Sequence, residues 1–219
     1  MVSAKDAKDL YRRLSDKGIQ IWLTGGWGID ALLGKETRPH KDLDAVLLLD
    51  DMVRMNEILS TAGYVLKDLW SENRWTIDSQ GNRTATVFVL QDGEGHEFDA
   101  HAISLDNQGN GVPAWEEVEE FLFTKAGLAG NGMIAGFPVR CITPEMQVYC
   151  HIGYELPEKQ LRDLELLHQK FGVGVPGKEK PNERLTQRPL DGAAPRGYGV
   201  RFGRIGAIIL SRFANPPRQ

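Results

Sequence analysis

The sequence predicts an α/β (α+β) fold, with a mixed β-sheet core and a smaller, mainly helical C-terminal domain. Residues 43–49 are almost continuously apolar, which is typical of a central strand covered on both faces. Helical and strand-like patterns alternate up to about residue 110, whereas the patterns after Gly111 are mainly helical. A chain of 219 residues is long enough to bury such a core.

The first half of the chain supplies helices and strands in turn. Ser3 and Asp6 have the spacing of a capping box at the start of the first helix, and Gly18 ends that helix. Turn clusters such as "SQGN" and "DGEG" separate the later strands. Helices are expected over 3–17, 27–34 and 51–63, and strands over 19–23, 43–49, 64–69, 74–78, 84–90 and 96–105.

The C-terminal part is divided by composition. Helical patterns are expected over 113–127, 143–154 and 156–172, where Pro144 follows Thr143 as a first helical residue does. Residues 173–219 are rich in Gly, Pro and Arg and show neither helical nor strand periodicity, so we expect a basic, poorly ordered extension. The predicted units are 1–110, 111–172 and 173–219.

Charge and composition exclude several classes of protein. Residues 173–219 carry nine Lys/Arg against three Asp/Glu, so the first 172 residues have a net charge of −10, which argues against a nucleic-acid partner. No apolar run is as long as a membrane span, and the charged N-terminus lacks the apolar core of a signal peptide. Cys141 and Cys150 do not have zinc-site spacing and fit free thiols. We expect a cytoplasmic protein without a membrane partner.

Two carboxylates in the central strand indicate a metal. Asp42 and Asp44 point to the same face, about 7 Å apart along the strand. Two anions so placed are costly unless a cation binds them, and Mg²⁺ accepts carboxylate and phosphate oxygens together. Asp99 could add a third carboxylate from a neighbouring strand. Since the 15 Asp of the chain give about one D-x-D by chance, the weight lies on the context of this pair.

That context is a phosphate-binding pattern. Gly25 and Gly26 lack the Cβ atoms that would block a phosphate, and the helix starting near Trp27 directs backbone N–H groups to the same space. Arg38 adds a positive charge before the carboxylates. The G-x-x-x-x-G-K and G-x-G-x-x-G motifs are absent. A nucleoside triphosphate with Mg²⁺ is therefore the predicted ligand.

These residues resemble the opening motif of the antibiotic nucleotidyltransferases, which include lincosamide nucleotidyltransferases and aminoglycoside 2''-adenylyltransferases of the polymerase-beta-like superfamily. The similar segments cover about residues 8–172: "WLTGGWGIDALLGKETRPHKDLD", "HEFDAHAISLDNQG", "GMIAGFPVRCITPEMQ" and "HIGYELPEKQLRDLELLHQKFG". The wider superfamily has Gly-Ser where this chain has Gly26-Trp27, and the tryptophan is usual in the antibiotic branch. The resemblance makes 1–110 the nucleotidyltransferase core and 111–172 a substrate-side helical region.

The resemblance also implies roles and a reaction. Asp42, Asp44 and Asp99 would bind Mg²⁺, and Asp99 would also be the general base. Gly25, Gly26, Trp27 and Arg38 would bind the nucleotide. The enzyme would transfer a nucleoside monophosphate, AMP from ATP, to a hydroxyl of a lincosamide or an aminoglycoside and so give resistance. A homodimer is implied as well. The alternatives are a minimal nucleotidyltransferase with a protein or other acceptor, and a nucleotide-binding module without turnover.

Other polar residues have less specific interpretations. His151 and Tyr154 are candidates for the substrate pocket, although packed side chains at a helix end explain them as well. His40 could position phosphate or make a structural hydrogen bond. A zinc site at "HEFDAH" is disfavoured because His96 and His101 fall on opposite faces of their strand.

Overall fold

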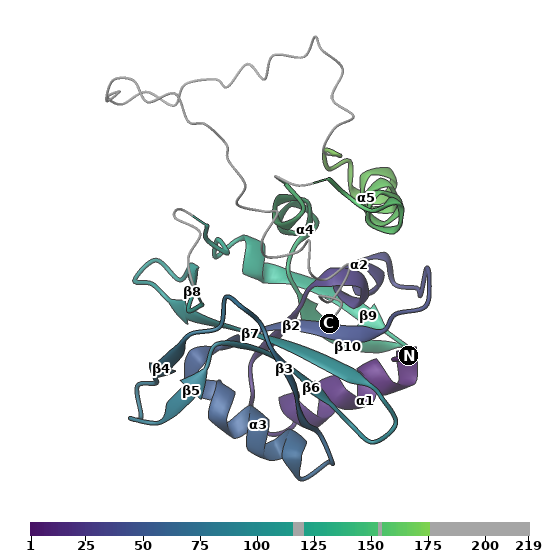
Figure 1. Ribbon diagram of the computed structural model, residues 1–219. Coiled ribbons are helices and arrows are strands. Elements are labelled where there is room, and N and C mark those ends of the chain that lie inside the picture. Colours follow the sequence, from purple (N-terminus) through teal and green to yellow (C-terminus); the bar gives the residue numbers. More distant parts are fainter. Residues whose placement is uncertain (116–120, 153–154, 176–219) are drawn as a thin grey trace, which may run out of the picture.

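The computed structural model describes residues 1–115, 121–152 and 155–175, and it is built around one mixed β-sheet (Figure 1). The strands run in the order β3-β6-β7-β2-β1-β10-β9, and β8 pairs with β7. A separate hairpin joins β4 to β5. The strands are β1 Ile21–Leu23, β2 Asp42–Leu48, β3 Val65–Leu69, β4 Trp75–Ile77, β5 Arg83–Ala85, β6 Val87–Gln91, β7 Glu97–Leu105, β8 Gly111–Pro113, β9 Gly130–Ile134 and β10 Phe137–Cys141.

The predicted mixed sheet is confirmed, with β2 near its centre. β2 pairs in parallel with β7 and antiparallel with β1. Its residues from Leu43 to Leu47 are buried, as the continuous apolar run predicts. The polar residues Asp42 and Asp44 are therefore exceptions within a strand that the sequence otherwise makes apolar.

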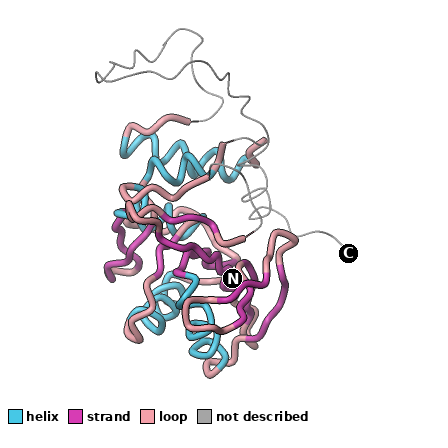
Figure 2. Tube along the Cα trace, turned by 90° about the vertical axis from the view of Figure 1, so that its left-hand side faces the viewer, coloured by secondary structure: helices cyan, strands magenta, loops and turns pink. Residues whose placement is uncertain are grey.

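Helices cover both faces of the sheet. Figures 1 and 2 show α1 and α3 on one side and α2, α4 and α5 on the other. The helices are α1 Ala4–Ser15, α2 Gly25–Leu33, α3 Met52–Ser60, α4 Pro144–Cys150 and α5 Glu158–Phe171, with short 3-10 turns at η1 Leu49–Asp51 and η2 Gly127–Ala129. In α1 the apolar stripe buries Ala7, Leu10, Tyr11 and Leu14 against the core. No helix among the described residues is long and apolar enough to cross a membrane.

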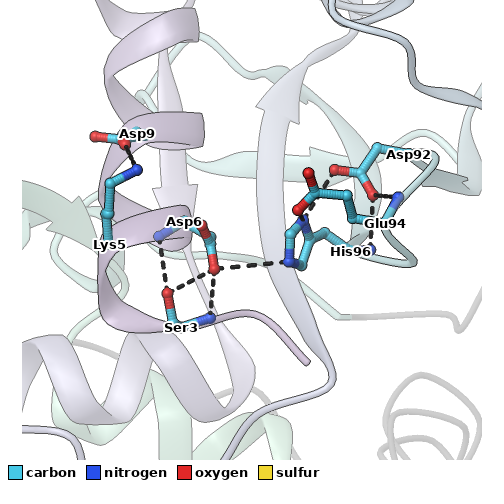
Figure 3. Close-up of polar contacts among 7 residues, drawn as sticks. All are labelled: Ser3, Lys5, Asp6, Asp9, Asp92, Glu94 and His96. Atoms are coloured by element: carbon cyan, nitrogen blue, oxygen red, sulfur yellow. Dashed lines mark hydrogen bonds and ion pairs between the residues drawn. The ribbon is translucent and has the colours of Figure 1, made fainter.

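The start of α1 is fixed by the predicted capping box (Figure 3). The hydroxyl of Ser3 accepts from the backbone N–H of Asp6, and Asp6 accepts from the backbone N–H of Ser3. Asp6 Oδ2 also lies 3.6 Å from His96 Nε2, and the other ring nitrogen of His96 lies 2.9 Å from Asp92. The N-terminal helix is thus linked to the turn that leads into β7.

Several boundaries differ from the sequence-based prediction. The second helix begins at Gly25 rather than at residue 27. The run 84–90 is split at Thr86, because β5 pairs with β4 while β6 joins the main sheet. The hairpin of β9 and β10 was not predicted, and it extends the sheet beyond β1 through β10. The division of the chain at residue 110 stays a prediction.

The helix expected over 113–127 is wrong in its described parts. Residues 116–120 lie outside the described residues, but 113–115 and 121–126 are not helical. Trp115, Phe121 and Phe123 are buried together, with neighbouring ring centroids 5.0 to 6.4 Å apart. Burial of these aromatic rings outweighs the local helical pattern. Residues 176–219, most of the predicted extension, also lie outside the described residues.

Candidate functional site

The register between β2 and β7 brings the predicted carboxylates together. In this parallel pair Asp44 stands opposite Asp99, and Asp42 stands opposite Glu97. Residues opposite each other in a sheet share a face, so all four carboxylates belong to one face. Asp42, Asp44 and Asp99 line one pocket of about 370 Å³, and Asp44 and Asp99 are each 3% exposed.

The electrostatics of this cluster call for a cation. Burial, followed by repulsion from Asp42 and Asp99, holds the pKa of Asp44 well above its usual range. Burial also raises the pKa of Asp42 and of Asp99. Asp44 Oδ1 is buried and has no hydrogen-bond partner within the described part of the chain. An ionised carboxylate in that position is costly until a positive charge reaches it.

The oxygen-only donor set fits Mg²⁺. Carboxylate oxygens are its preferred protein ligands, and it usually keeps waters and binds phosphate oxygens as well. Over residues 1–115, 121–152 and 155–175, no group of three or more His, Cys, Asp or Glu side chains is arranged so that it could hold a metal ion. A Mg²⁺ site at Asp42, Asp44 and Asp99 would therefore need further oxygen ligands, such as those of a triphosphate.

The two glycines at the start of α2 are required by close packing. Gly25 has φ +57°, and a Cβ there would lie 2.2 Å from Asp44 Oδ2. A Cβ on Gly26 would lie 2.2 Å from His40 Nδ1. These contacts bring the N-terminus of α2, with its outward N–H groups, directly against the carboxylate cluster, and both glycines line the pocket.

Trp27 lies behind this wall. Its side chain is 2% exposed, and its ring centroid is 4.7 Å from that of His40. His40 Nε2 is 2.6 Å from Asp30 Oδ2, and Asp30 also accepts from the hydroxyl and backbone N–H of Thr37. His40 thus makes the structural hydrogen bond considered from the sequence, although it also lines the pocket. A nucleotide contact by Trp27 stays a prediction that only its backbone could fulfil.

Arg38 lies in the pocket but is already paired. Its Nε and Nη2 donate to the carboxylate of Asp163 in α5, the shortest distance being 2.8 Å. Asp163 is buried and lines the same pocket. No local pattern marks Asp163 as this partner, because the two residues are 125 positions apart. Arg38 is predicted to neutralise phosphate, and it would do so while its guanidinium is paired with the carboxylate of Asp163.

Of the two residues predicted for the substrate pocket, His151 is among the described residues and Tyr154 is not. His151 is 2% exposed, lines the pocket and has Nδ1 2.6 Å from the carbonyl oxygen of Gln147. Burial lowers its pKa, which favours a neutral imidazole. Tyr154 lies outside the described residues.

Two further features of the pocket were not predicted from the sequence. Glu97 is buried between Lys41, at 3.0 Å, and Lys67, and both lysines line the pocket. Lys67 lies at a register shift in β3, between Leu66 and Asp68. Trp70 donates from its indole Nε1 to Asp99 Oδ1 at 2.9 Å. No periodic pattern or motif marks these residues.

Known proteins share this sequence pattern and fold. The model of the family described as aminoglycoside-2''-adenylyltransferase matches residues 7–167. A lincosamide resistance protein of Staphylococcus haemolyticus is 26% identical over 159 residues, covering 73% of this chain and 88% of the relative. A 2''-aminoglycoside nucleotidyltransferase of Klebsiella pneumoniae is 27% identical over 172 residues, covering 72% and 81%.

Solved structures are similar as well. The lincomycin-bound crystal structure of a lincosamide antibiotic adenylyltransferase has a TM-score of 0.63 and 25% identity, covering 76% of this chain and 96% of that chain. The structure of ANT(2'')-Ia with adenylyl-2''-tobramycin has a TM-score of 0.55 and 20% identity, covering 76% and 88%. The second likeness concerns the fold alone.

Proposed function

Because the chain belongs to the aminoglycoside-2''-adenylyltransferase family, a family of antibiotic nucleotidyltransferases, we propose that it transfers AMP from ATP to a hydroxyl of a small antibiotic. The observation that carries this proposal is the register of β2 and β7. It places Asp44 opposite Asp99, and Asp42 lies two residues earlier on the same face of β2. This cluster faces the N-terminus of α2 in one pocket. Carboxylates for metal and N–H groups for phosphate are the two requirements of nucleotidyl transfer.

Each group has a role in this proposal. Asp42, Asp44 and Asp99 would hold Mg²⁺, which when bound stabilises the charge that develops on the phosphate oxygens. The N-terminus of α2 at Gly25 and Gly26 binds the triphosphate through its N–H groups. Arg38 contributes positive charge beside the start of α2, since its Nη2 would lie 2.9 Å from a Cβ on Gly26. Lys41 and Lys67 stand at the same pocket and add to its capacity to hold phosphate.

The transfer is an in-line displacement. The acceptor hydroxyl oxygen forms a bond to the α-phosphorus of ATP, and the bond between the α-phosphorus and the bridging oxygen of pyrophosphate breaks. The hydroxyl proton passes to Asp99, and pyrophosphate leaves with the electron pair of the broken bond.

The acceptor is proposed to be a lincosamide or an aminoglycoside. The relatives described above carry these two specificities in their names. The higher TM-score to the lincomycin-bound enzyme supports testing lincosamides first. A homodimer in the cytoplasm remains part of the proposal, and light scattering after size-exclusion chromatography tests the dimer.

A pyrophosphate-release screen tests the function. Purified protein, ATP and Mg²⁺ are incubated with lincosamides and with aminoglycosides, and the product is checked for an added adenylyl group by mass spectrometry. We expect release with one class, reduced at least about a hundredfold by Asp99→Asn. Asp16→Asn, at the exposed end of α1, is the matched control. Adenylylation of a protein instead of any antibiotic would favour the alternative acceptor, and full turnover in Asp99→Asn would remove Asp99 as the base.

A further inference from the structure

The indole of Trp70 contacts one carboxylate oxygen of Asp99, the predicted general base. Its Nε1–H donates to Asp99 Oδ1 at 2.9 Å. His101 Nδ1 approaches the same oxygen at 3.6 Å, beyond hydrogen-bonding distance. Trp70 and Asp99 both line the pocket.

The segment that carries Trp70 is tied to the sheet. It follows β3, and Asn73 donates from its backbone N–H to the carbonyl oxygen of Trp70 at 2.9 Å. The side-chain oxygen of Asn73 accepts from the backbone N–H groups of Thr86 and Val87, at 2.8 and 3.2 Å. Arg74 donates from its backbone to the hydroxyl of Thr86 at 2.9 Å. Thr86 is fully buried, so the segment is held against the start of β6.

The pairing of β6 with β7 then places the indole of Trp70 next to Asp99. β6 pairs with β7, and Val89 of β6 stands opposite Asp99. The anchored segment and the carboxylate therefore rest on two adjacent strands of one sheet. This is the arrangement by which a catalytic group is held in a fixed rotamer, through a neighbour that is itself fixed.

We propose that Trp70 is a positioning residue that fixes the rotamer of Asp99, holding Oδ1 and presenting Oδ2 to the acceptor hydroxyl and the metal. The role of Asp99 in this statement rests on the proposed function. An indole suits the task because its N–H only donates and does not ionise at physiological pH. A hydrogen bond from it to a buried carboxylate is charge-assisted and stronger than a neutral one.

Kinetics of Trp70→Phe test the proposal. Phenylalanine keeps an aromatic ring and removes the N–H. We expect kcat to fall about tenfold to a hundredfold, while the KM for ATP stays within about twofold. The matched control is Trp75→Phe, because Trp75 is 53% exposed in the β4–β5 hairpin and packs over Arg83. A kcat equal to that of the control would overturn the proposal.

A spectroscopic test does not depend on turnover. The chain has five tryptophans, so the ¹H–¹⁵N spectrum shows five indole signals, and the one lost in Trp70→Phe belongs to Trp70. We expect this signal to move upfield in Asp99→Ala and to stay in place in Asp16→Ala. An unmoved signal in Asp99→Ala contradicts the hydrogen bond. If the wild-type enzyme lacks turnover, the proposed function fails, while this spectrum still decides the contact. If Trp70→Phe does not fold, the Trp70 signal is assigned by elimination from Phe variants of the other four tryptophans, and its shift in Asp99→Ala carries the decision.

Discussion

Arg38 and Asp163 form an ion pair that joins the segment before β2 to α5. The side chain of Asp163 is 6% exposed and that of Arg38 is 26% exposed. The same pair forms part of the pocket wall. It therefore links the position of α5 to the pocket that contains the carboxylates of β2 and β7.

Breaking this pair should destabilise the protein. Asp163→Ala leaves the guanidinium without its buried partner, so we expect the free energy of unfolding to fall by about 3 kcal/mol, measured by urea titration. Glu158→Ala is the control, because Glu158 pairs with Arg162 on the same helix and both are more than 70% exposed. Its effect should stay below about 1 kcal/mol. Equal effects of the two variants would contradict a structural role for the buried pair.

Substitutions at Gly25 and Gly34 distinguish a steric clash from backbone strain. Gly25 and Gly34 both have positive φ, at +57° and +76°, but a Cβ on Gly34 meets nothing within 4 Å. Gly34→Ala should cost about 1 kcal/mol of stability and leave turnover intact. Gly25→Ala should also displace Asp44 and reduce kcat/KM by at least about a hundredfold. Thermal melts and pyrophosphate release check both variants, and comparable turnover in the two would rule out the clash.

Asp44→Asn should separate stability from activity. The pKa of Asp44 is raised in the fold, so its ionised form at pH 7 opposes folding, and the stability lost in this way is regained only as the pH falls. Without metal, we expect the free energy of unfolding of Asp44→Asn to be about 1 kcal/mol higher than that of the wild type. Mg²⁺ should raise the Tm of the wild type more than that of Asp44→Asn. A lower stability of the metal-free variant would contradict the electrostatic account.

The capping box should make stability depend on acid pH. The hydrogen bond from Ser3 lowers the pKa of Asp6 below its usual 3.8. This contribution is complete above pH 3.8 and is lost as the pH falls through the lower folded value. Ser3→Ala should cost about 1 kcal/mol at pH 7 and less at pH 3, by urea unfolding. Ser60→Ala, an exposed serine at the end of α3, should show no such pH dependence; a cost for Ser3→Ala that is equal at both pH values would refute the link.

Both cysteines should be unreactive in the folded protein. Burial raises the pKa of the Cys141 thiol to about 12 and raises that of Cys150 further. At pH 8 only a small fraction of either thiol is ionised, so iodoacetamide should label them slowly in buffer and rapidly in urea. Intact mass spectrometry follows the labelling. Rapid modification of the native protein would show that these thiols are accessible.

The sequence predicted those parts of the structure that depend on local pattern. The carboxylates on β2, the double glycine and the amphipathic stripe of α1 follow from side-chain periodicity and backbone freedom. The glycine interpretation needed correction, because Gly25 and Gly26 make room for Asp44 and His40 as well as for a ligand. The hairpin of β9 and β10 escaped prediction because "GNGMI" and "FPVRC" lack clear alternation.

The rest of the site depends on contacts between distant segments. The pairing of Asp44 with Asp99 requires the β2–β7 register, and that of Arg38 with Asp163 requires α5 to pack over the pocket. Trp70 stands in a segment without periodicity, and its contact with Asp99 joins that segment, which Asn73 binds to β6, to a residue of β7. Such partners follow from tertiary packing, which a pattern in one segment does not encode.

The register shift in β3 also bears on solubility. β3 is the outermost strand beside β6, and its five residues are exposed, among them Val65, Leu66 and Leu69. An apolar edge strand of this kind invites a strand from another molecule to add to it. The pairing of β3 with β6 is irregular between Leu66 and Asp68, and the residue between them, Lys67, places a charge at the centre of this strand and pairs with Glu97. A charged residue in the middle of an edge strand disfavours the addition of another strand, so the lysine that pairs with Glu97 in the pocket also stands where it opposes such pairing.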